Sequence, residues 1–282
     1  MSSADIVREY YNQNPQIEWN RLEGGKPEFE ITMRQLKENL KPSSKILDVG
    51  GGPGRYAFSL TELGHKVTLF DLSEGNIEFA KNKSRELGIS LDNYICGNAT
   101  QLSNYISDKY DAVLCLGPLY HLNGEKDRIA VINNCLEILN SNGIIAFGFI
   151  SAFAKYTAVL KFLTQHMNDE SKVDFMRKKY FEVVPHLLKY AQNKASIFER
   201  TDDGFTESNF TSPHHLANFL ESFGIETIVL TSPECLLTHY DELRYLPKDI
   251  YDSLLNVTYY YAKNPALHGS SEHLLYLGRK KR

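Results

Sequence analysis

The stretch from Lys45 to Phe58, Lys-Ile-Leu-Asp-Val-Gly-Gly-Gly-Pro-Gly-Arg-Tyr-Ala-Phe, decides which fold this sequence predicts. Its opening apolar residues, Ile46, Leu47 and Val49, indicate a short buried strand. Four glycines and one proline then break the strand. Apolar residues at helical spacing follow: Tyr56, Ala57, Leu60 and Leu63. A strand, a glycine turn and a helix form a cradle for a ligand. Glycines let the ligand approach the backbone, and the helix offers free N–H groups and its positive dipole end.

The spacing of the glycines indicates which ligand this cradle takes. A dinucleotide-binding turn that begins at Gly50 would have its third glycine at position 55, which is Arg55. Here the spacing is Gly50, Gly52 and Gly54, and Asp48 stands two residues before the first of them. An acid at this place suits a ligand with an ammonium group. The pattern resembles the first motif of the class I S-adenosylmethionine-dependent methyltransferases, Asp-x-Gly-x-Gly-x-Gly. A tight turn without a ligand is the alternative.

The resemblance implies a place for each part of the cofactor S-adenosyl-L-methionine. Residues 67–70 indicate a second strand that ends at Asp71, 21 positions after Gly50. An acid at about this distance can accept both ribose hydroxyls of an adenosine group, and the resemblance gives Asp71 the same role. After a third strand at 91–96, Asn98 replaces the aspartate that typically accepts from the adenine amino group, and its carbonyl oxygen can still accept. The remaining implied cofactor contacts are Leu72, Ala99 and Leu116.

The fourth strand, 111–116, ends in the string Gly-Pro-Leu-Tyr-His-Leu at positions 117–122. Ligands of open parallel sheets bind beyond the carboxyl ends of the strands, where the strand order reverses, so this loop should lie beside the glycine turn. The string resembles a branch of bacterial small-molecule methyltransferases. It would bring Tyr120 and His121 near the transferable methyl group, with His121 as a general base or a substrate orienter. The alternative for His121 is a loop histidine hydrogen-bonded to the backbone.

The alternation of strands and helices up to residue 150 predicts an α/β fold with a doubly wound sheet. The resemblance implies the seven-stranded, Rossmann-like methyltransferase sheet, with six strands parallel and the last antiparallel. We expect four parts: an N-terminal helical flap (1–40), the S-adenosylmethionine-binding sheet core (41–150), a helical insertion after strand five (151–204) and the C-terminal part of the sheet domain (205–282). Residues 152–200 contain no obvious strand. The insertion is expected to cover the active site, or else to pack on itself or on a second subunit.

The N-terminal flap offers three further side chains to the site. Tyr11, Trp19 and Arg21 would contact the cofactor or the substrate if the flap closes over them, with Arg21 available to a carboxylate. The alternative is that Tyr11 and Trp19 only pack the flap onto the sheet. Near the other end of the chain, Asn209 and the motif Ser271-x-His273 also resemble the same methyltransferase branch, but no chemistry can be attached to them.

Composition and charge narrow the classes of function. The 282 residues include 42% hydrophobic and 23% charged residues, which is ordinary for a globular protein. The formal net charge of −4 gives no general reason to bind nucleic acid, and no apolar run is long enough to span a membrane. The four cysteines show no metal-site spacing, so no metal is expected. Without a signal-peptide pattern, a reduced cytoplasmic protein is the simplest account.

Together these features predict transfer of a methyl group from S-adenosylmethionine to an oxygen, nitrogen, sulfur or carbon nucleophile of a small molecule. Two alternatives stay open. The first is an NAD(P)-dependent oxidoreductase, although the arginine at position 55 argues against it. The second is a protein that binds S-adenosylmethionine without catalysis. The sequence names neither the acceptor nor the oligomeric state, and a homodimer stays open.

Overall fold

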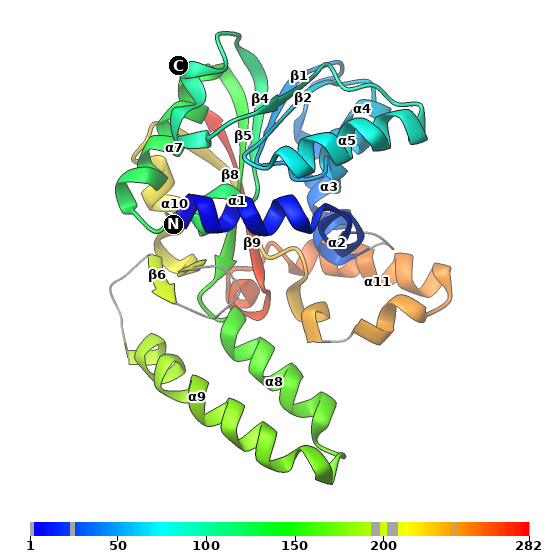
Figure 1. Ribbon diagram of the computed structural model, residues 1–282, viewed down its shortest axis with the longest axis vertical. Coiled ribbons are helices and arrows are strands. Elements are labelled where there is room, and N and C mark those ends of the chain that lie inside the picture. Colours follow the sequence, from blue (N-terminus) through cyan, green and yellow to red (C-terminus); the bar gives the residue numbers. More distant parts are fainter. Residues whose placement is uncertain (1–2, 23–25, 193–197, 202–207, 240, 282) are drawn as a thin grey trace.

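The computed structural model describes residues 3–22, 26–192, 198–201, 208–239 and 241–281 (Figure 1). The strands are β1 (Lys45–Val49), β2 (Lys66–Asp71), β3 (Asn93–Cys96), β4 (Tyr110–Cys115), β5 (Leu139–Ser151), β6 (Phe198–Thr201), β7 (Ser208–Thr211), β8 (Ile225–Thr231) and β9 (His273–Lys280). The α-helices are α1 (Ser3–Gln13), α2 (Pro15–Arg21), α3 (Pro27–Asn39), α4 (Arg55–Glu62), α5 (Glu74–Leu87), α6 (Pro118–His121), α7 (Glu125–Ile138), α8 (Ala154–His166), α9 (Val173–Gln192), α10 (Pro213–Glu221) and α11 (Lys248–Tyr261).

The described strands join in one sheet, whose central path β3-β2-β1-β4-β5 is parallel throughout. β9 pairs antiparallel with residues 144–150 of β5, and β8 pairs antiparallel with β9. β8 therefore runs in the same direction as β5. This arrangement confirms the seven-stranded methyltransferase sheet with six parallel strands and one antiparallel strand.

Two further strands extend the sheet at the end of β5. Ile150 and Ser151 pair parallel with β7, and β7 pairs antiparallel with β6. The expectation of no strand in 152–200 is therefore wrong at its last residues, because β6 begins at Phe198. These four-residue strands are stabilised by pairing with distant backbone, and their own sequences carry little periodicity.

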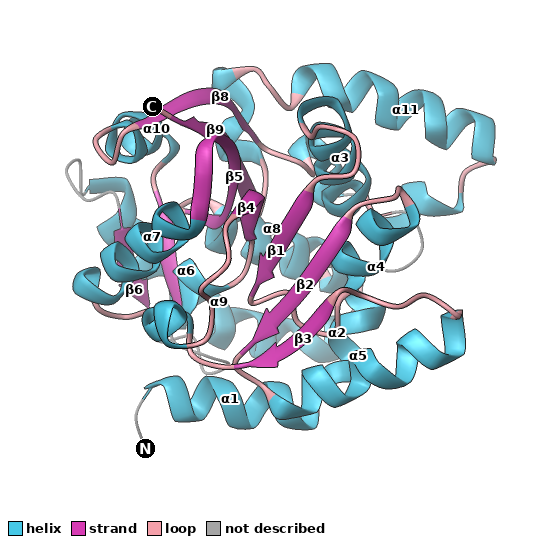
Figure 2. Cartoon of the chain, turned by 90° about the horizontal axis from the view of Figure 1, so that it is seen from above, coloured by secondary structure: helices cyan, strands magenta, loops and turns pink. Residues whose placement is uncertain are grey.

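Helices cover both faces of the sheet, as a doubly wound fold requires (Figure 2). α3, α4 and α5 lie on one face, and α7 and α10 lie on the other. Successive residues of β1 alternate between these two cores: Leu47 and Val49 enter the core with α7, and Ile46 enters the core with α4. A strand buried on both faces is apolar along its whole length, which explains the Ile-Leu-x-Val run.

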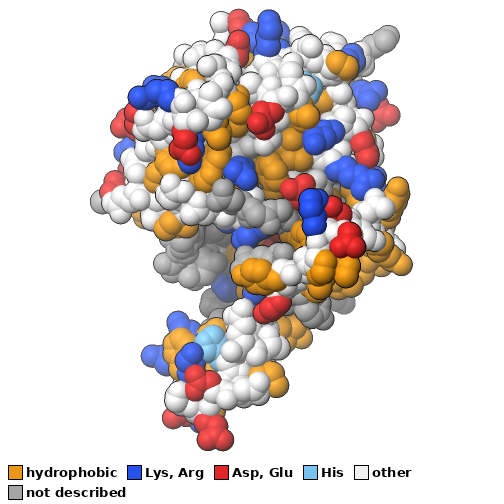
Figure 3. All heavy atoms as spheres, turned by 90° about the vertical axis from the view of Figure 1, so that its right-hand side faces the viewer, with side chains coloured by type: hydrophobic (Ala, Val, Ile, Leu, Met, Phe, Trp, Pro, Cys, Tyr) orange, Lys and Arg blue, Asp and Glu red, His pale blue; other side chains and the backbone are white. Residues whose placement is uncertain are grey.

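The helices predicted after β5 are present as α8 and α9. They form an arm that stands away from the sheet (Figures 1 and 3), held together by Phe162 and Phe175, whose rings meet edge to face at 5.6 Å. On the face of the molecule in Figure 3, positive and negative side chains are interspersed. Among the described residues, no helix is both long enough and apolar enough to cross a membrane.

Candidate active site

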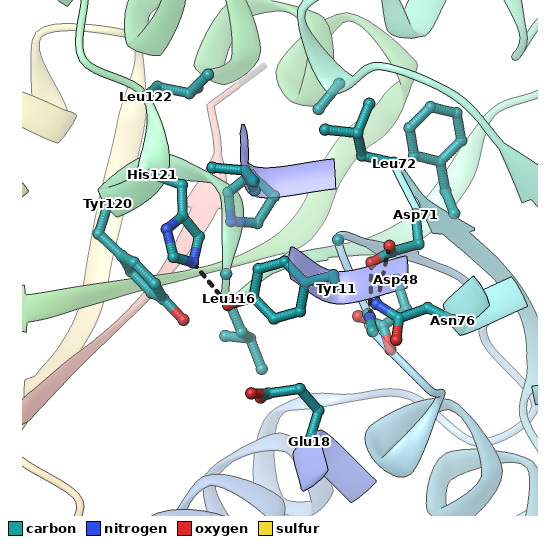
Figure 4. Close-up of a pocket in the computed structure, with 18 of the residues that line it drawn as sticks. Tyr11, Glu18, Asp48, Asp71, Leu72, Asn76, Leu116, Tyr120, His121 and Leu122 are labelled. Atoms are coloured by element: carbon teal, nitrogen blue, oxygen red, sulfur yellow. Dashed lines mark hydrogen bonds between the residues drawn. The ribbon is translucent and has the colours of Figure 1, made fainter. Parts of the chain in front are cut away.

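A cavity of about 390 Å³ opens at the carboxyl ends of β1, β2 and β4, under the N-terminal helix α1 (Figure 4). Its walls come from segments far apart in the sequence: the glycine turn, the end of β2, the loop at 97–100, the loop at 116–123, and α1 to α3. This is the edge where ligands of parallel sheets bind. No lining residue belongs to the described part of 151–204, so the covering role of that insertion stays a prediction.

The turn at 50–54 requires glycine for two reasons: its backbone has positive φ angles, and a neighbouring loop approaches it closely. Gly50, Gly52 and Gly54 all have positive φ angles, of 67°, 58° and 90°. A Cβ atom on Gly50 would lie 2.3 Å from the ring of Pro118, so the turn and the loop after β4 touch at this point. At Gly52 the nearest atom to such a Cβ would be 3.9 Å away, which leaves open space beside the backbone. Gly54 does not line the cavity but precedes α4 and packs on Phe58.

Asp48, at the end of β1, is a buried acid without a partner for its Oδ2 atom. The side chain is 1% exposed, and Oδ2 makes no hydrogen bond. Burial, followed by the nearby negative charge of Asp71, raises the pKa of Asp48 to about 7. An unsatisfied carboxylate oxygen in a cavity wall is costly unless a cation or donor binds it, so this position favours an ammonium group.

Asp71, at the end of β2, is held in place by three donors. Its Oδ2 accepts from the Gly52 N–H at 2.8 Å, and its Oδ1 accepts from the Ser73 N–H at 2.9 Å and from the Asn76 amide at 3.1 Å. Burial raises the pKa of Asp71, and these hydrogen bonds oppose that rise. The carboxylate is thus fixed at the cavity wall beside Leu72, with lone pairs left for ligand hydroxyls.

Asn98 and Ala99 line the cavity as expected, but the Asn98 carbonyl is already engaged. Its Oδ1 accepts from the Thr100 N–H at 3.0 Å and from the Thr100 hydroxyl at 2.9 Å, and so caps the short 3-10 helix that follows. The side-chain oxygen of Asn98, which was expected to accept from an adenine amino group, therefore already accepts two hydrogen bonds from Thr100. The adenine contact of Asn98 stays a prediction.

The loop after β4 brings Leu116, Tyr120 and His121 to the cavity. The Tyr11 hydroxyl and the His121 Nε2 atom are 2.9 Å apart and share a hydrogen bond (Figure 4). Burial, helped by the positive charge of Arg21, lowers the pKa of His121 to about 4. Burial raises the pKa of Tyr11, and it raises the pKa of Tyr120 to about 12. At neutral pH the imidazole is therefore unprotonated and both phenols keep their protons.

Two side chains that the sequence did not mark as functional hold this loop. Asn209 of β7 donates from its amide to the carbonyls of Leu122 and Tyr120. Arg128 of α7 donates to the Leu122 carbonyl at 2.6 Å. Asn209 belongs to the motif that resembled the methyltransferase branch without a known role. Its position explains the motif as a support for the loop that carries His121.

The N-terminal flap is docked on the sheet domain by α1. Asn12 accepts from the Ser73 hydroxyl at 2.8 Å and from the Gly75 N–H at 3.1 Å. A Cβ on Gly75 would lie 2.5 Å from the Asn12 carbonyl oxygen, so only glycine allows this approach. Tyr11 reaches the cavity, whereas Trp19 does not. Trp19 is buried against Phe58 and Phe79, as the packing interpretation predicts.

A chain of charged groups begins in the cavity wall, at Glu18, Arg21 and Glu28, and continues to Glu234 and His273, which do not line the cavity. Arg21 pairs with Glu28 at 2.7 Å and with Glu18 at 3.2 Å, so it is already bound to two carboxylates. His273 hydrogen-bonds to Glu234 and lies 3.9 Å from Glu28. Burial alone would lower the pKa of His273, but Glu28 and Glu234 raise it to about 9. Arg21 and Glu28 meet Glu234 and His273 here, although more than two hundred residues separate the two pairs in the sequence, and of the four only Arg21 and His273 gave a signal in the sequence.

The residues present fit S-adenosylmethionine. Asp48 offers an unpaired acceptor for its ammonium group, Asp71 offers acceptors for its ribose hydroxyls, and the open side of Gly52 leaves room for the chain between them. The three ligand atoms of Glu28, Glu234 and His273 lie within 4.8 Å of one another. They are already paired among themselves and with Arg21 and Ser271, which makes them a charge network in this structure.

Comparison with known proteins agrees with this geometry. Residues 47–147 match the methyltransferase domain family. The ubiquinone biosynthesis O-methyltransferase of Chromobacterium violaceum is 29% identical over 160 residues, 55% of this chain and 67% of that protein. The enzyme of the same name from Saccharophagus degradans is 32% identical over 136 residues, 45% of this chain and 56% of that protein. This chain therefore spans about half to two thirds of the curated relatives it matches.

A solved structure shows the same fold. The Burkholderia thailandensis 1,6-didemethyltoxoflavin-N1-methyltransferase, crystallised with 1,6-didemethyltoxoflavin and S-adenosylhomocysteine, superposes with a TM-score of 0.59 at 12% identity. The superposition covers 99% of this chain and 89% of that one. Residues 47–147 of this chain thus match a methyltransferase domain in sequence, and the chain shares the fold of this solved methyltransferase.

Proposed function

We propose that the whole protein transfers the methyl group of S-adenosylmethionine to a nucleophile on a small molecule. The observation that carries this proposal is the convergence of Asp48, Asp71 and the Tyr11–His121 pair on one cavity. Its volume of about 390 Å³ falls in the range of small-molecule sites. When bound, the cofactor supplies a methyl group made electrophilic by the sulfonium.

The residues of this chain contribute positioning and one proton acceptor. Asp48 and Asp71 fix the two ends of the cofactor, which holds the methyl group in line with the acceptor atom. Such orientation alone is worth about 7–11 kcal/mol. Held by Asp48 and Asp71, the cofactor would supply its methyl group for direct displacement by the acceptor atom. The proton of a hydroxyl or amine acceptor passes to the unprotonated imidazole of His121.

The acceptor is proposed to be a hydroxyl compound. Two observations support this choice. Hydroxyl acceptors must lose a proton, and a neutral histidine faces the cavity to receive it. Two curated relatives that match over the domain are named ubiquinone biosynthesis O-methyltransferases.

The test is an incubation of the purified protein with S-adenosylmethionine and a panel of phenols, alcohols, amines and thiols. Formation of S-adenosylhomocysteine together with a product heavier by one methyl group is the expected result, with phenols or alcohols as the best acceptors. The Asp71→Ala variant should give neither product. If the cofactor binds but no compound in a broad panel is methylated, the protein is a non-catalytic binder and the proposal fails.

A further inference from the structure

The cavity contains a guanidinium group that the function described so far does not use. Arg55 is the first residue of α4, lines the cavity and is partly buried. Its Nε atom is buried and has no hydrogen-bond partner. Within the described part of the chain Arg55 makes no ion pair either. Its guanidinium carbon instead lies 4.7 Å from the ring centre of Trp19 and 5.6 Å from that of Phe29.

Arg21, the other arginine that lines the cavity, does form ion pairs. Arg21 was expected to be available to a carboxylate, but it is bound to Glu28 and Glu18. Among the described residues the guanidinium of Arg55 has no counter-ion, and it stands at the end of a helix whose dipole is also positive there. A partly buried guanidinium with unused donors is costly unless an anion binds it. Arg55 is therefore the anion receptor that the cavity still offers.

An unpaired acid stands on the other side of the glycine turn. Asp48 precedes the turn and Arg55 follows it, and each has a buried polar atom without a partner. One lacks a cation and the other lacks an anion. The two groups together are complementary to a zwitterion of the α-amino acid type, with an ammonium and a carboxylate on the same carbon.

We propose that Arg55 binds the carboxylate of the cofactor's amino-acid tail, while Asp48 binds the ammonium of the same tail. The aromatic rings of Trp19 and Phe29 hold the guanidinium plane in position by cation–π contact, which gives Trp19 a positioning role although it does not line the cavity. The site thereby selects nucleosides that carry the zwitterionic tail against nucleosides that lack it. This inference rests on the cofactor assignment of the proposed function.

Calorimetric titration with two ligands tests the inference without any acceptor. S-adenosylhomocysteine carries the tail, and 5′-methylthioadenosine has the same nucleoside and a thioether but no tail. In Arg55→Met, which keeps the aliphatic stem, affinity for S-adenosylhomocysteine should fall about 10- to 100-fold, as for loss of a charge-assisted hydrogen bond. Affinity for 5′-methylthioadenosine should not change. Arg85→Met, at an exposed arginine on α5, is the matched control and should leave both affinities unchanged.

The possible outcomes distinguish a failure of the role of Arg55 from a failure of the cofactor assignment. Unchanged binding of S-adenosylhomocysteine by Arg55→Met, or an equal loss for both ligands, would overturn the role of Arg55. If the wild-type protein binds neither ligand, the cofactor assignment itself fails. Fluorescence gives a second readout, since Trp19 is the only tryptophan of the chain and touches Arg55. S-adenosylhomocysteine should shift its emission and 5′-methylthioadenosine should not, and an identical response to both would also overturn the proposal.

Discussion

Binding of the cofactor's ammonium group beside Asp48 should release a proton from the protein. Burial and the charge of Asp71 raise the pKa of Asp48 to about 7, so about half of the molecules carry a proton there at pH 7 and about nine-tenths do at pH 6. A cation placed against the carboxylate stabilises its ionised form and drives that proton off. The expected release is thus about half a proton per ligand at pH 7, rising towards one at pH 6.

The sign of the pH effect follows from the same linkage. Below pH 7 the ligand must displace a proton before it can pair with Asp48, so affinity should weaken as the pH falls. The loss approaches tenfold, or about 1.4 kcal/mol, for each pH unit below the pKa. Above pH 7 the ionised fraction grows, and the release falls to about a tenth of a proton at pH 8.

The assay is calorimetric titration of S-adenosylhomocysteine at pH 6 and pH 7 in two buffers with different ionisation enthalpies. The difference in apparent binding enthalpy between the buffers gives the number of protons exchanged. Asp48→Asn cannot ionise and should show no release from this site, whereas the exposed Asp92→Asn should behave as wild type. Equal enthalpies in both buffers for the wild type, or a release that persists in Asp48→Asn, would refute the reasoning.

Three further predictions concern single side chains. Replacement of Asp71 by alanine removes an acid that three donors hold in place, so affinity for S-adenosylhomocysteine should fall at least about tenfold in calorimetry; an unchanged affinity would contradict its role. His121→Ala should lower turnover of an identified acceptor with cofactor affinity kept, and at saturating cofactor the acidic limb of the wild-type rate should lie near pH 4, so a limb near pH 6.5 under the same conditions would count against the base role. His273→Gln should destabilise the fold most below pH 6.5, and the difference from wild type in urea unfolding should disappear as the pH rises through about 9, because the folded state raises the pKa of His273. A difference that is equal at pH 6 and pH 10 would show that His273 is not stabilised as a cation.

The sequence predicted correctly those features that depend on a short stretch of neighbouring residues. Asp48 and Asp71 each end a buried strand, and their distance from the glycine turn is fixed by the strand–turn–helix unit itself. Apolar runs between turn residues marked the strands β1, β2, β4 and β5, and the family resemblance supplied the seven-stranded order. β6 and β7 were not predicted, because each has four residues and depends on pairing with the other and with the end of β5.

Contacts between distant segments account for the rest of what the sequence could not reveal. The hydrogen bond between Tyr11 and His121 joins residues 110 positions apart, and no periodicity encodes such a pairing. The sequence also gave the wrong arginine as the free one. The sequence does not distinguish Arg21 from Arg55, since both are arginines. Only the positions of Glu18 and Glu28 in the structure show that Arg21 is the one paired with carboxylates.

The docking of α1 determines how anything leaves the cavity on that side. The helix forms a roof fastened at one end by three hydrogen bonds, one from the Tyr11–His121 pair and two to Asn12. Net contributions of about 0.5–1.5 kcal/mol each give these three hydrogen bonds a combined share of about 1.5–4.5 kcal/mol in the cost of opening. The residence time of S-adenosylhomocysteine should then depend on how readily α1 opens. Substitution of Asn12, which does not line the cavity, should therefore change the rate of turnover.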